Sequence, residues 1–332
     1  MRISPAKSRP GFLLFLLFTM MQLCSNAFSA GAQELSRAAT LFRTIRSGSG
    51  SDLEELLSKG ADANDTLAGY SALMGATLNG TAEQMKILIA HGADVNYQTK
   101  KGVSALWLAV PDWDKTILLL DHGSDVQHKI EGYNVLVKLA AVPGTLRLIR
   151  LLMDKGADPK KSASDNYLLY NAASSGDTAI LGFFMRIGFN VNDTVSYGDA
   201  PINAALTFRT FGTLKMLVEN GANVNFQSMT VQTLPAFVGV TPLMLAALSH
   251  DKPAFYYLLE HGADPNLRSK KGYTALMLLE QSEVDDPAMT LDLIKHGAMV
   301  SAKMPDGTDA LYYANKRGNA PSVEILKNYA AK

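Results

Sequence analysis

The sequence contains little cysteine and has no excess of charge of either sign. Cys24 is the single cysteine among 332 residues, so the chain has no set of cysteines that could bind a metal. Lysine plus arginine number 31, and aspartate plus glutamate also number 31. Binding to a phosphate backbone usually requires a large basic surplus, which this chain lacks. We therefore do not expect nucleic acid as a partner.

Long hydrophobic runs are also scarce. A membrane-spanning helix needs about 20 apolar residues, and the apolar run from Phe12 to Leu23 is shorter. Basic residues precede this run and small residues follow it, which is the three-part pattern of a secretory signal peptide. We expect residues 1–32 to be a signal peptide, cleaved before Gln33 or, as a second candidate, after Ala27. An uncleaved membrane anchor is the alternative.

The signal peptide predicts an exported protein, periplasmic or secreted, and most simply bacterial. No membrane insertion is expected after cleavage. Cys24 would leave with the signal peptide, so the mature chain would meet an oxidising compartment without a thiol. Lipid attachment at Cys24 is disfavoured because Leu23 stands where such a site needs a small residue.

A repeated pentapeptide dominates the rest of the chain. Three copies read Gly-Ala-Asp-x-Asn and begin at Gly60, Gly92 and Gly262. Related copies begin at Gly123, Gly156, Gly188, Gly221 and Gly297, with steps of 31 to 41 residues between successive glycines. An apolar pair stands four and three residues before every one of these glycines, as in Leu88-Ile89. This spacing predicts a helix with a buried stripe, ended by a glycine in the left-handed conformation.

A second signature follows the pentapeptide by seven to ten residues. It reads Gly-Tyr-Ser-Ala-Leu from Gly69, and similar segments begin at Gly102, Gly239 and Gly272. A turn glycine is followed by a serine or threonine that can cap a helix, and then by alanine or proline at the first helical position. Each repeat is therefore predicted to contain a turn and two helices.

Together these segments resemble the ankyrin repeat. The closest match is the segment from Thr241 to Asn266, TPLMLAALSHDKPAFYYLLEHGADPN, and the resemblance covers about residues 35 to 331. It implies an all-α solenoid of about nine helix-turn-helix units, each with a β-turn finger. The histidine of the family's Thr-Pro-Leu-His core is replaced here by Met74, Trp107, Val137, Tyr170, Asn203, Met244, Met277 and Tyr312.

The repeat sets the expected domain organisation. Residues 33–332 would form the repeat domain, and residues 304–332 its C-terminal cap, where Lys327 replaces the second member of the apolar pair. One finger is longer than the others, over about residues 227–239, and contains several apolar side chains. We expect this long finger to bind a partner. The acidic connection from Glu283 to Asp286 is expected to be merely solvated.

The resemblance implies binding on the face formed by the fingers and the inner helices. Aromatic and apolar finger residues are the candidate partner contacts, because large side chains with few rotamers suit interface hot spots. These candidates are Tyr70, Tyr97, Tyr133, Tyr197, Phe226, Leu234, Phe237 and Tyr273. Trp113, which precedes an outer helix, is a further candidate.

Catalytic and metal-binding patterns are missing. No segment matches a phosphate loop, a His-Glu-x-x-His zinc site or a Gly-x-Ser-x-Gly elbow. Histidines 91, 122, 261 and 296 each precede a repeat glycine, where a basic group favours the helix dipole. We therefore expect no enzyme activity, no cofactor and no metal. The expected function is protein binding by a monomer outside the cytoplasm; the alternatives are an inhibitor or immunity protein that blocks a toxic or hydrolytic enzyme, and a hydrolase.

Overall fold

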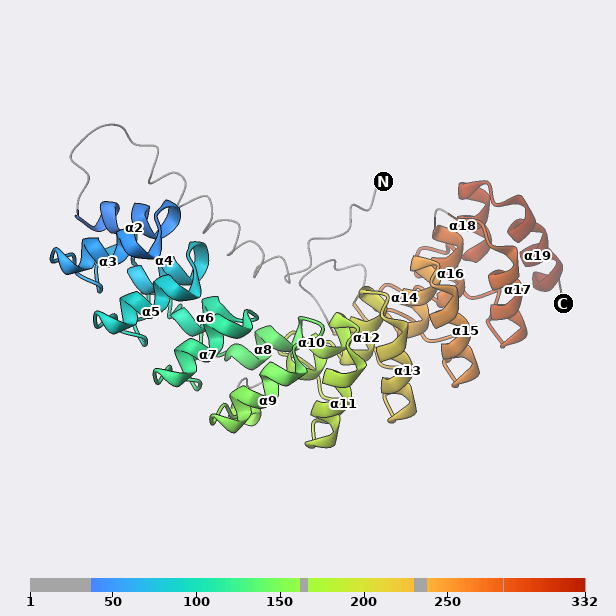
Figure 1. Ribbon diagram of the computed structural model, residues 1–332. Helices are drawn as coiled ribbons and strands as arrows, with labels where there is room; N and C mark the ends of the chain where they lie inside the picture. Colours follow the sequence, from blue (N-terminus) through green and yellow to red (C-terminus); the bar gives the residue numbers. More distant parts are fainter. Residues whose placement is uncertain (1–36, 162–166, 230–237, 283, 332) are drawn as a thin grey trace. The chain divides into compact units, whose positions relative to one another are not determined.

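The computed structural model describes residues 37–161, 167–229, 238–282 and 284–331. The chain divides into two compact units, with the boundary between Asp125 and Val126. Figure 1 labels the helices of both units. The two units are described separately below. The predicted signal peptide, residues 1–32, lies outside the described residues.

The first unit contains six helices and a short hairpin among its described residues. The elements are α2 (Arg37–Ser47), α3 (Gly50–Ser58), β1 (Thr66–Leu67), β2 (Tyr70–Ser71), α4 (Ala72–Asn79), α5 (Ala82–Ala90), α6 (Ala105–Ala109) and α7 (Trp113–Asp121). Strands β1 and β2 pair antiparallel, with Thr66 opposite Ser71. This hairpin is a finger.

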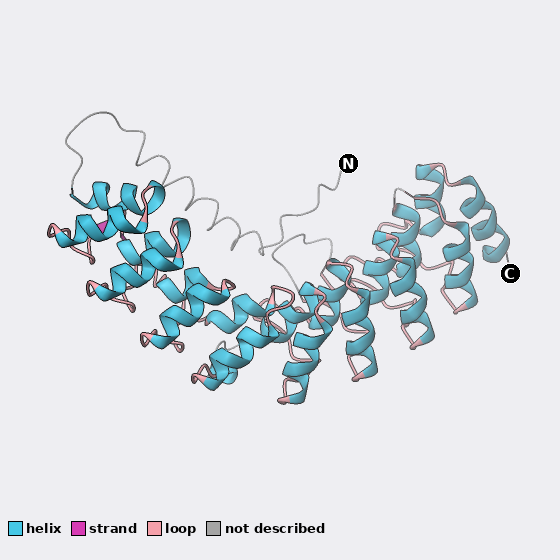
Figure 2. Cartoon of the chain, viewed as in Figure 1, coloured by secondary structure: helices cyan, strands magenta, loops and turns pink. Residues whose placement is uncertain are grey.

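The second unit continues the same alternation of an inner and an outer helix (Figure 2). Its elements are α8 (Val135–Ala140), α9 (Leu146–Asp154), η1 (Pro159–Lys161), α10 (Tyr167–Ser175), α11 (Thr178–Arg186), α12 (Pro201–Thr207), α13 (Phe211–Glu219), α14 (Pro242–Ser249), α15 (Lys252–Glu260), α16 (Ala275–Gln281), α17 (Pro287–Lys295), α18 (Ala310–Arg317) and α19 (Ala320–Ala330). The finger before α18 closes with an antiparallel bridge between Lys303 and Asp309.

Within each unit the helices form two layers (Figure 1). The even-numbered helices pack on one another, as α14 packs on α16 and α16 on α18, and the odd-numbered helices form the second layer. The described residues contain nine such helix pairs. The predicted all-α repeat fold with nine helix-turn-helix units is therefore confirmed. None of the helices in the described part of the chain is long and apolar enough to span a membrane.

Local sequence signals determine where the helices begin and end. The side chains of Ser71, Ser104, Thr241 and Thr274 each accept a hydrogen bond from the backbone N–H three residues later, as N-caps do. The repeat glycines all have positive φ, between 81° at Gly123 and 103° at Gly156. Only glycine adopts that conformation without steric cost, so the predicted helix ends are confirmed.

The core consists mainly of the apolar residues predicted by the repeat. The first member of the apolar pair is fully buried in seven of the eight repeats that carry it, as at Leu88 and Leu293. In the first repeat Leu57, the second member of the pair, is the buried residue, and Leu56 is only half-buried. In the last helix Leu326 is buried and Lys327 is exposed, as expected of a cap.

Asparagines in five of the eight pentapeptides join one repeat to the next. The side chain of Asn64 donates to the carbonyl of Gly92 (2.9 Å) and accepts from the backbone N–H of Asp94 (2.8 Å). The same pair of bonds is made by Asn96, Asn192, Asn225 and Asn266. Lys160 stands at this position between the repeat of α9 and the repeat of α11. A lysine has no amide and cannot make this link.

Replacing Lys160 with asparagine is therefore expected to stabilise the second unit. The backbone at Lys160 already makes the hydrogen bond found at the asparagine positions. The N–H of Lys160 donates to Asp158 Oδ1 (2.9 Å), and the N–H of Asn266 donates in the same way to Asp264 Oδ1 (2.8 Å). Two new hydrogen bonds, to the carbonyl of Gly188 and the N–H of Asn190, would raise the free energy of unfolding by about 1–2 kcal/mol. Urea denaturation measures this change. Asn192→Ala, the control, should lower stability, and no gain from Lys160→Asn would contradict the prediction.

The acidic connection before α17 is more than solvated, which corrects the expectation from the sequence. Asp286 caps α17 and binds Lys252 Nζ (2.6 Å), and Asp285 accepts a hydrogen bond from Ser322 Oγ (2.8 Å). Nearby, Glu280 is almost fully buried and accepts a hydrogen bond from Thr290 Oγ1 (2.5 Å). The partners of these carboxyl groups come from α15, α17 and α19, and the apolar periodicity alone does not specify such contacts.

Burial raises the pKa of Glu280, against the opposing effect of hydrogen bonds from Thr290 and Asn319. The native state therefore holds the proton more tightly than the unfolded chain, where a glutamate has a pKa of about 4.3. The free energy of unfolding must then fall as the pH rises between the two pKa values. Glu280→Gln cannot ionise and keeps the acceptor for Thr290.

At pH 4 we expect Glu280→Gln to melt near the wild-type temperature. At pH 8 we expect it to melt at a higher temperature than wild type at the same pH. Thermal melting followed by circular dichroism at several pH values measures the difference. Glu324→Gln, an exposed change on α19, is the control and should show no such trend. A stability difference between Glu280→Gln and wild type that is the same at every pH would contradict the assignment.

Candidate functional site

Four tyrosines gather on the finger face of the second unit. Tyr133 comes from the finger before α8, Tyr167 and Tyr170 from α10, and Tyr197 from the finger before α12. Tyr167 lies at the centre, with ring centroids 4.9 Å from Tyr133 and 6.1 Å from Tyr197, both edge to face. Tyr170 and Tyr197 pack edge to face at 5.9 Å. All four rings are half-buried. We call these residues the tyrosine cluster.

A buried carboxylate lies at the inner edge of the tyrosine cluster. Asp199 Oδ1 accepts from Asn203 Nδ2 (2.8 Å) and from the backbone N–H of Ala200 (3.0 Å). Its Oδ2 accepts from the hydroxyl of Tyr170 (3.4 Å). Burial raises the pKa of Asp199, and burial together with the charge of Asp199 raises the pKa of Tyr170. The Tyr170 phenol therefore stays neutral at ordinary pH and donates its hydrogen bond to Asp199.

The base of the long finger lies beside this cluster. The backbone N–H of Met229 donates to the carbonyl of Gly198 (2.9 Å), the residue after Tyr197. The two sides of the base pair with each other, since Ser228 N–H donates to the carbonyl of Val240 (3.1 Å). Met229 itself is 56% exposed, among the largest exposed fractions of any apolar side chain described. The finger face here combines half-buried aromatic rings with an exposed apolar side chain.

The predicted contacts in the long finger divide between described and undescribed residues. Residues 230–237, which include Leu234 and Phe237, lie outside the described residues, so their role as contacts stays a prediction. Phe226, before the base, is half-buried. Trp113 is also half-buried and forms the first turn of α7.

The remaining predicted tyrosines lie elsewhere on the fingers. In the first unit Tyr70 belongs to β2, and the hydroxyl of Tyr97 donates to the carbonyl of Gly69 (3.3 Å) in the preceding finger. In the second unit Tyr273 packs against Tyr313, with ring centroids 6.0 Å apart. These rings contribute to packing between repeats and leave part of their surface exposed.

The sequence predicted two members of the tyrosine cluster and missed the other two. Tyr133 and Tyr197 were among the candidates, whereas Tyr167 and Tyr170 were not. A signal was present: Tyr170 occupies the position of the family's core histidine, and Tyr167 lies three residues earlier on the same face of the inner helix. A search of inner-helix positions as well as finger positions would have found both.

The histidines that precede the repeat glycines are bound to nearby groups. Nδ1 of His122, His261 and His296 each lies 2.7–2.8 Å from the carbonyl oxygen four residues earlier in its own helix. Nε2 of His91 lies 2.9 Å from Glu54 Oε1. These contacts match the helix-terminal role predicted for the histidines. Within the described ranges, no three potential ligands among His, Cys, Asp and Glu gather as a metal site would require.

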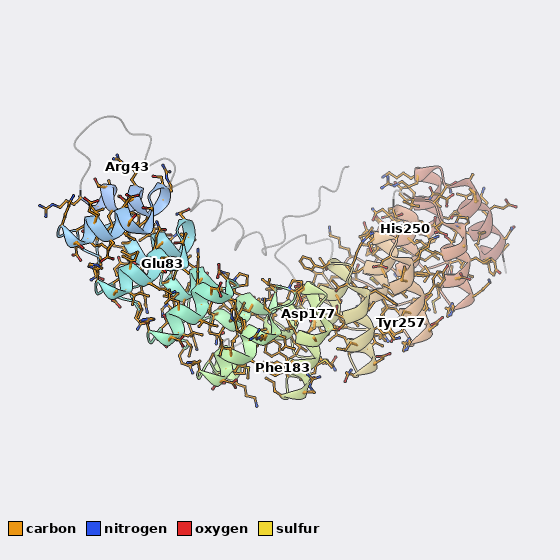
Figure 3. All side chains as sticks on the ribbon, viewed as in Figure 1. Arg43, Glu83, Asp177, Phe183, His250 and Tyr257 are labelled. Carbon is orange, nitrogen blue, oxygen red and sulfur yellow. The ribbon has the colours of Figure 1, made fainter. Side chains whose placement is uncertain are left out.

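One serine–histidine contact bears on the hydrolase alternative. His250 directly follows the last residue of α14 (Figure 3). Its Nδ1 lies 2.9 Å from Ser282 Oγ. Ser282 is only 6% exposed, and its hydroxyl also donates to the carbonyl of Val284 (3.1 Å). Burial lowers the pKa of His250. The serine is thus covered and bound to backbone, so this pair connects two helix ends and presents no nucleophile to a substrate.

Comparison with known proteins identifies a family and relatives that match large parts of the chain. Residues 41–130 and 243–332 match a family model described as ankyrin repeats (3 copies). The human ankyrin repeat and SOCS box protein 6 is 29% identical over 223 residues, which are 64% of this chain and 48% of that protein.

Two larger relatives cover still more of the chain. The Caenorhabditis elegans ankyrin repeat and KH domain-containing protein mask-1 is 25% identical over 308 residues, 89% of this chain and 11% of that protein. Human Rabankyrin-5 is 26% identical over 259 residues, 69% of this chain and 21% of that protein. The chain thus spans about half or less of the length of these relatives.

Proposed function

This chain belongs to the ankyrin-repeat family, whose repeats are protein–protein interaction modules, and we propose that it is a non-catalytic module that binds another protein on its finger face. The tyrosine cluster and the base of the long finger supply the anchor of this interaction. Tyrosine is suited to that role because it has a large, rigid, amphipathic surface that is costly to leave in water.

The position of the cluster supports this proposal more than the number of aromatic residues does. Tyr133, Tyr167 and Tyr197 hold one another in place by edge-to-face contacts, so little side-chain entropy is lost when a partner covers them. Met229 lies beside them with more than half of its surface exposed. The combination of ordered aromatic rings and an exposed apolar neighbour is the observation that carries the proposal.

We further propose that the module acts outside the cytoplasm, in a bacterial periplasm or after secretion. The support is the sequence pattern of residues 1–32, with basic residues, an apolar run and small residues before Gln33. Cell fractionation combined with N-terminal sequencing tests this localisation. A full-length chain recovered from the cytosol would refute export and leave the binding function untouched.

Site-specific photocrosslinking tests the binding face. Benzoylphenylalanine placed at Met229 should capture a partner in cells, whereas the same group at Met299 should not. Met299 is the matched control because it is also exposed, at 62%, but lies at the turn after α17. Capture at position 299 and not at 229 would refute the assigned face. Mass spectrometry of the captured protein then identifies the partner, and an enzyme that loses activity on binding would mark the module as an inhibitor.

A further inference from the structure

Two neighbouring fingers near the C-terminus carry a group of exposed basic residues. These are Arg268, Lys270 and Lys271 in the finger before α16, and Lys303 in the finger before α18. None of the four forms an ion pair within the described part of the chain, whereas Lys252 and Lys295, on outer helices, do. We call these four residues the basic patch.

The backbone beneath the basic patch is held by hydrogen bonds from one finger to the next. Arg268 Nη1 donates to the carbonyl of Lys303 (2.6 Å). On the other side, Gln227 Nε2 donates to the carbonyl of Arg268 (2.8 Å), and the N–H of Lys270 donates to the carbonyl of Val238 (2.8 Å). The finger backbone and the Arg268 side chain are therefore preorganised, which reduces the entropy lost on binding.

Acidic side chains close to the basic patch are occupied by local hydrogen bonds. Asp306 accepts from the N–H and the hydroxyl of Thr308 (3.0 and 2.7 Å), and these bonds lower the pKa of its carboxyl group. Asp309 caps α18 by accepting from the N–H of Tyr312 (2.9 Å). These carboxylates are held by their own fingers, and within the described residues none of them forms an ion pair with an ammonium group of the basic patch.

Aromatic rings border the basic patch. Tyr273, in the finger before α16, and Tyr313, on α18, have their hydroxyls 3.4 Å apart. Tyr312, at the start of α18, is 46% exposed, and Lys316 Nζ lies 5.6 Å from the centre of its ring. A ligand that covers this surface would meet positive charge and apolar ring area together.

We propose that the basic patch binds an acidic segment of the protein partner, in which carboxylates alternate with apolar side chains. This inference rests on the proposed function and adds the chemistry of the partner. A short segment suits the surface better than a long polyanion, because the described residues of the adjoining finger, 226–229 and 238–240, include no charged residue. The equal numbers of basic and acidic residues, 31 each, provide no wider positive field for nucleic acid.

A labelled peptide of twelve residues, with glutamate alternating with leucine and tyrosine, is the probe. The matched peptide has glutamine in place of every glutamate. Fluorescence anisotropy should show that the purified chain binds the acidic peptide about tenfold or more tightly than the glutamine peptide, with an affinity that falls as salt is added. The triple variant Lys270→Gln, Lys271→Gln, Lys303→Gln should lose about tenfold in affinity.

The chain offers a matched control in its first unit. Thr99-Lys100-Lys101-Gly102 repeats the local pattern of Ser269-Lys270-Lys271-Gly272, and both of its lysines are exposed. Lys100→Gln with Lys101→Gln should therefore leave peptide affinity unchanged. Circular dichroism confirms that each variant is folded.

Three results would overturn the proposal. They are equal affinity for the two peptides, an equal loss in the first-unit control, and tighter binding of a single-stranded oligonucleotide or of phosphatidylglycerol vesicles than of the acidic peptide. Failure of the proposed function is recognised separately, because it appears as the absence of a crosslink at position 229. The peptide measurement does not depend on that crosslink.

Discussion

Phe184→Ala is expected to lower the free energy of unfolding by about 3–5 kcal/mol, the cost of truncating a fully buried phenylalanine. The ring of Phe184 has no exposed surface and packs edge to face on Phe183 and Phe189, with centroids 5.5 and 5.6 Å away. It is also the first member of the apolar pair in its repeat. Urea denaturation followed by circular dichroism measures the loss.

Phe183→Ala is the matched control on the same helix (Figure 3). Phe183 is half-buried, and the guanidinium carbon of Arg150 lies 5.3 Å from the centre of its ring. Loss of that contact and of partial burial should cost about 1–2 kcal/mol. Because each repeat contacts mainly its neighbours, the Phe184 variant should also show a broadened transition. Equal costs at the two positions would contradict the assigned core.

Gly198→Ala is expected to destabilise the second unit by about 2–4 kcal/mol and to displace the base of the long finger. Gly198 has φ of 76°, a left-handed conformation that costs a residue with a Cβ atom about 1–2 kcal/mol. A Cβ atom here would also lie 2.7 Å from Cβ of Met229, so the backbone of the finger base would have to move. Such overpacking costs about 1–3 kcal/mol more.

Gly307→Ala separates the two contributions. Gly307 has φ of 85°, but nothing lies within 4 Å of the position that its Cβ would take. This control should therefore lose only the conformational part, about 1–2 kcal/mol. Thermal melting compares the two variants, and photocrosslinking from position 229 should weaken only in Gly198→Ala. If both glycines cost the same and crosslinking is unchanged, the long finger does not rest on Gly198.

Helix positions could be predicted well because their signals are local. The cap at Thr241 depends on a hydroxyl three residues from its donor, and the helix end at Gly262 depends on one glycine. Local signals could not predict that finger aromatics such as Tyr97 and Tyr273 would be half-buried. Each of these rings packs on a finger or helix about 30 or more residues away in the chain.

The polar interior was the least predictable part. From the sequence, nothing distinguishes Lys160 from the other residues of the pentapeptides. The side-chain hydrogen bonds of Asn192 and Asn266 show that this position links successive repeats. Likewise, the sequence presents Asp285 as part of an exposed acidic run, but packing of α19 brings Ser322 to it. Specific polar partners depend on which side chains meet across repeats, and apolar periodicity does not encode that choice.

By itself, the sequence determined the family and the number of repeats, because the same motifs recur with a period near 33 residues. It also indicated helix starts and ends such as those at Thr241 and Gly262, because a capping hydroxyl or a glycine acts within about one turn of chain. Only the tertiary structure decided that Tyr133, Tyr167, Tyr170 and Tyr197 share one surface with Met229, and that the basic residues at 268, 270, 271 and 303 lie on joined fingers. The reason is physical: these contacts form between successive repeats after they stack, and stacking brings together residues that have no local interaction.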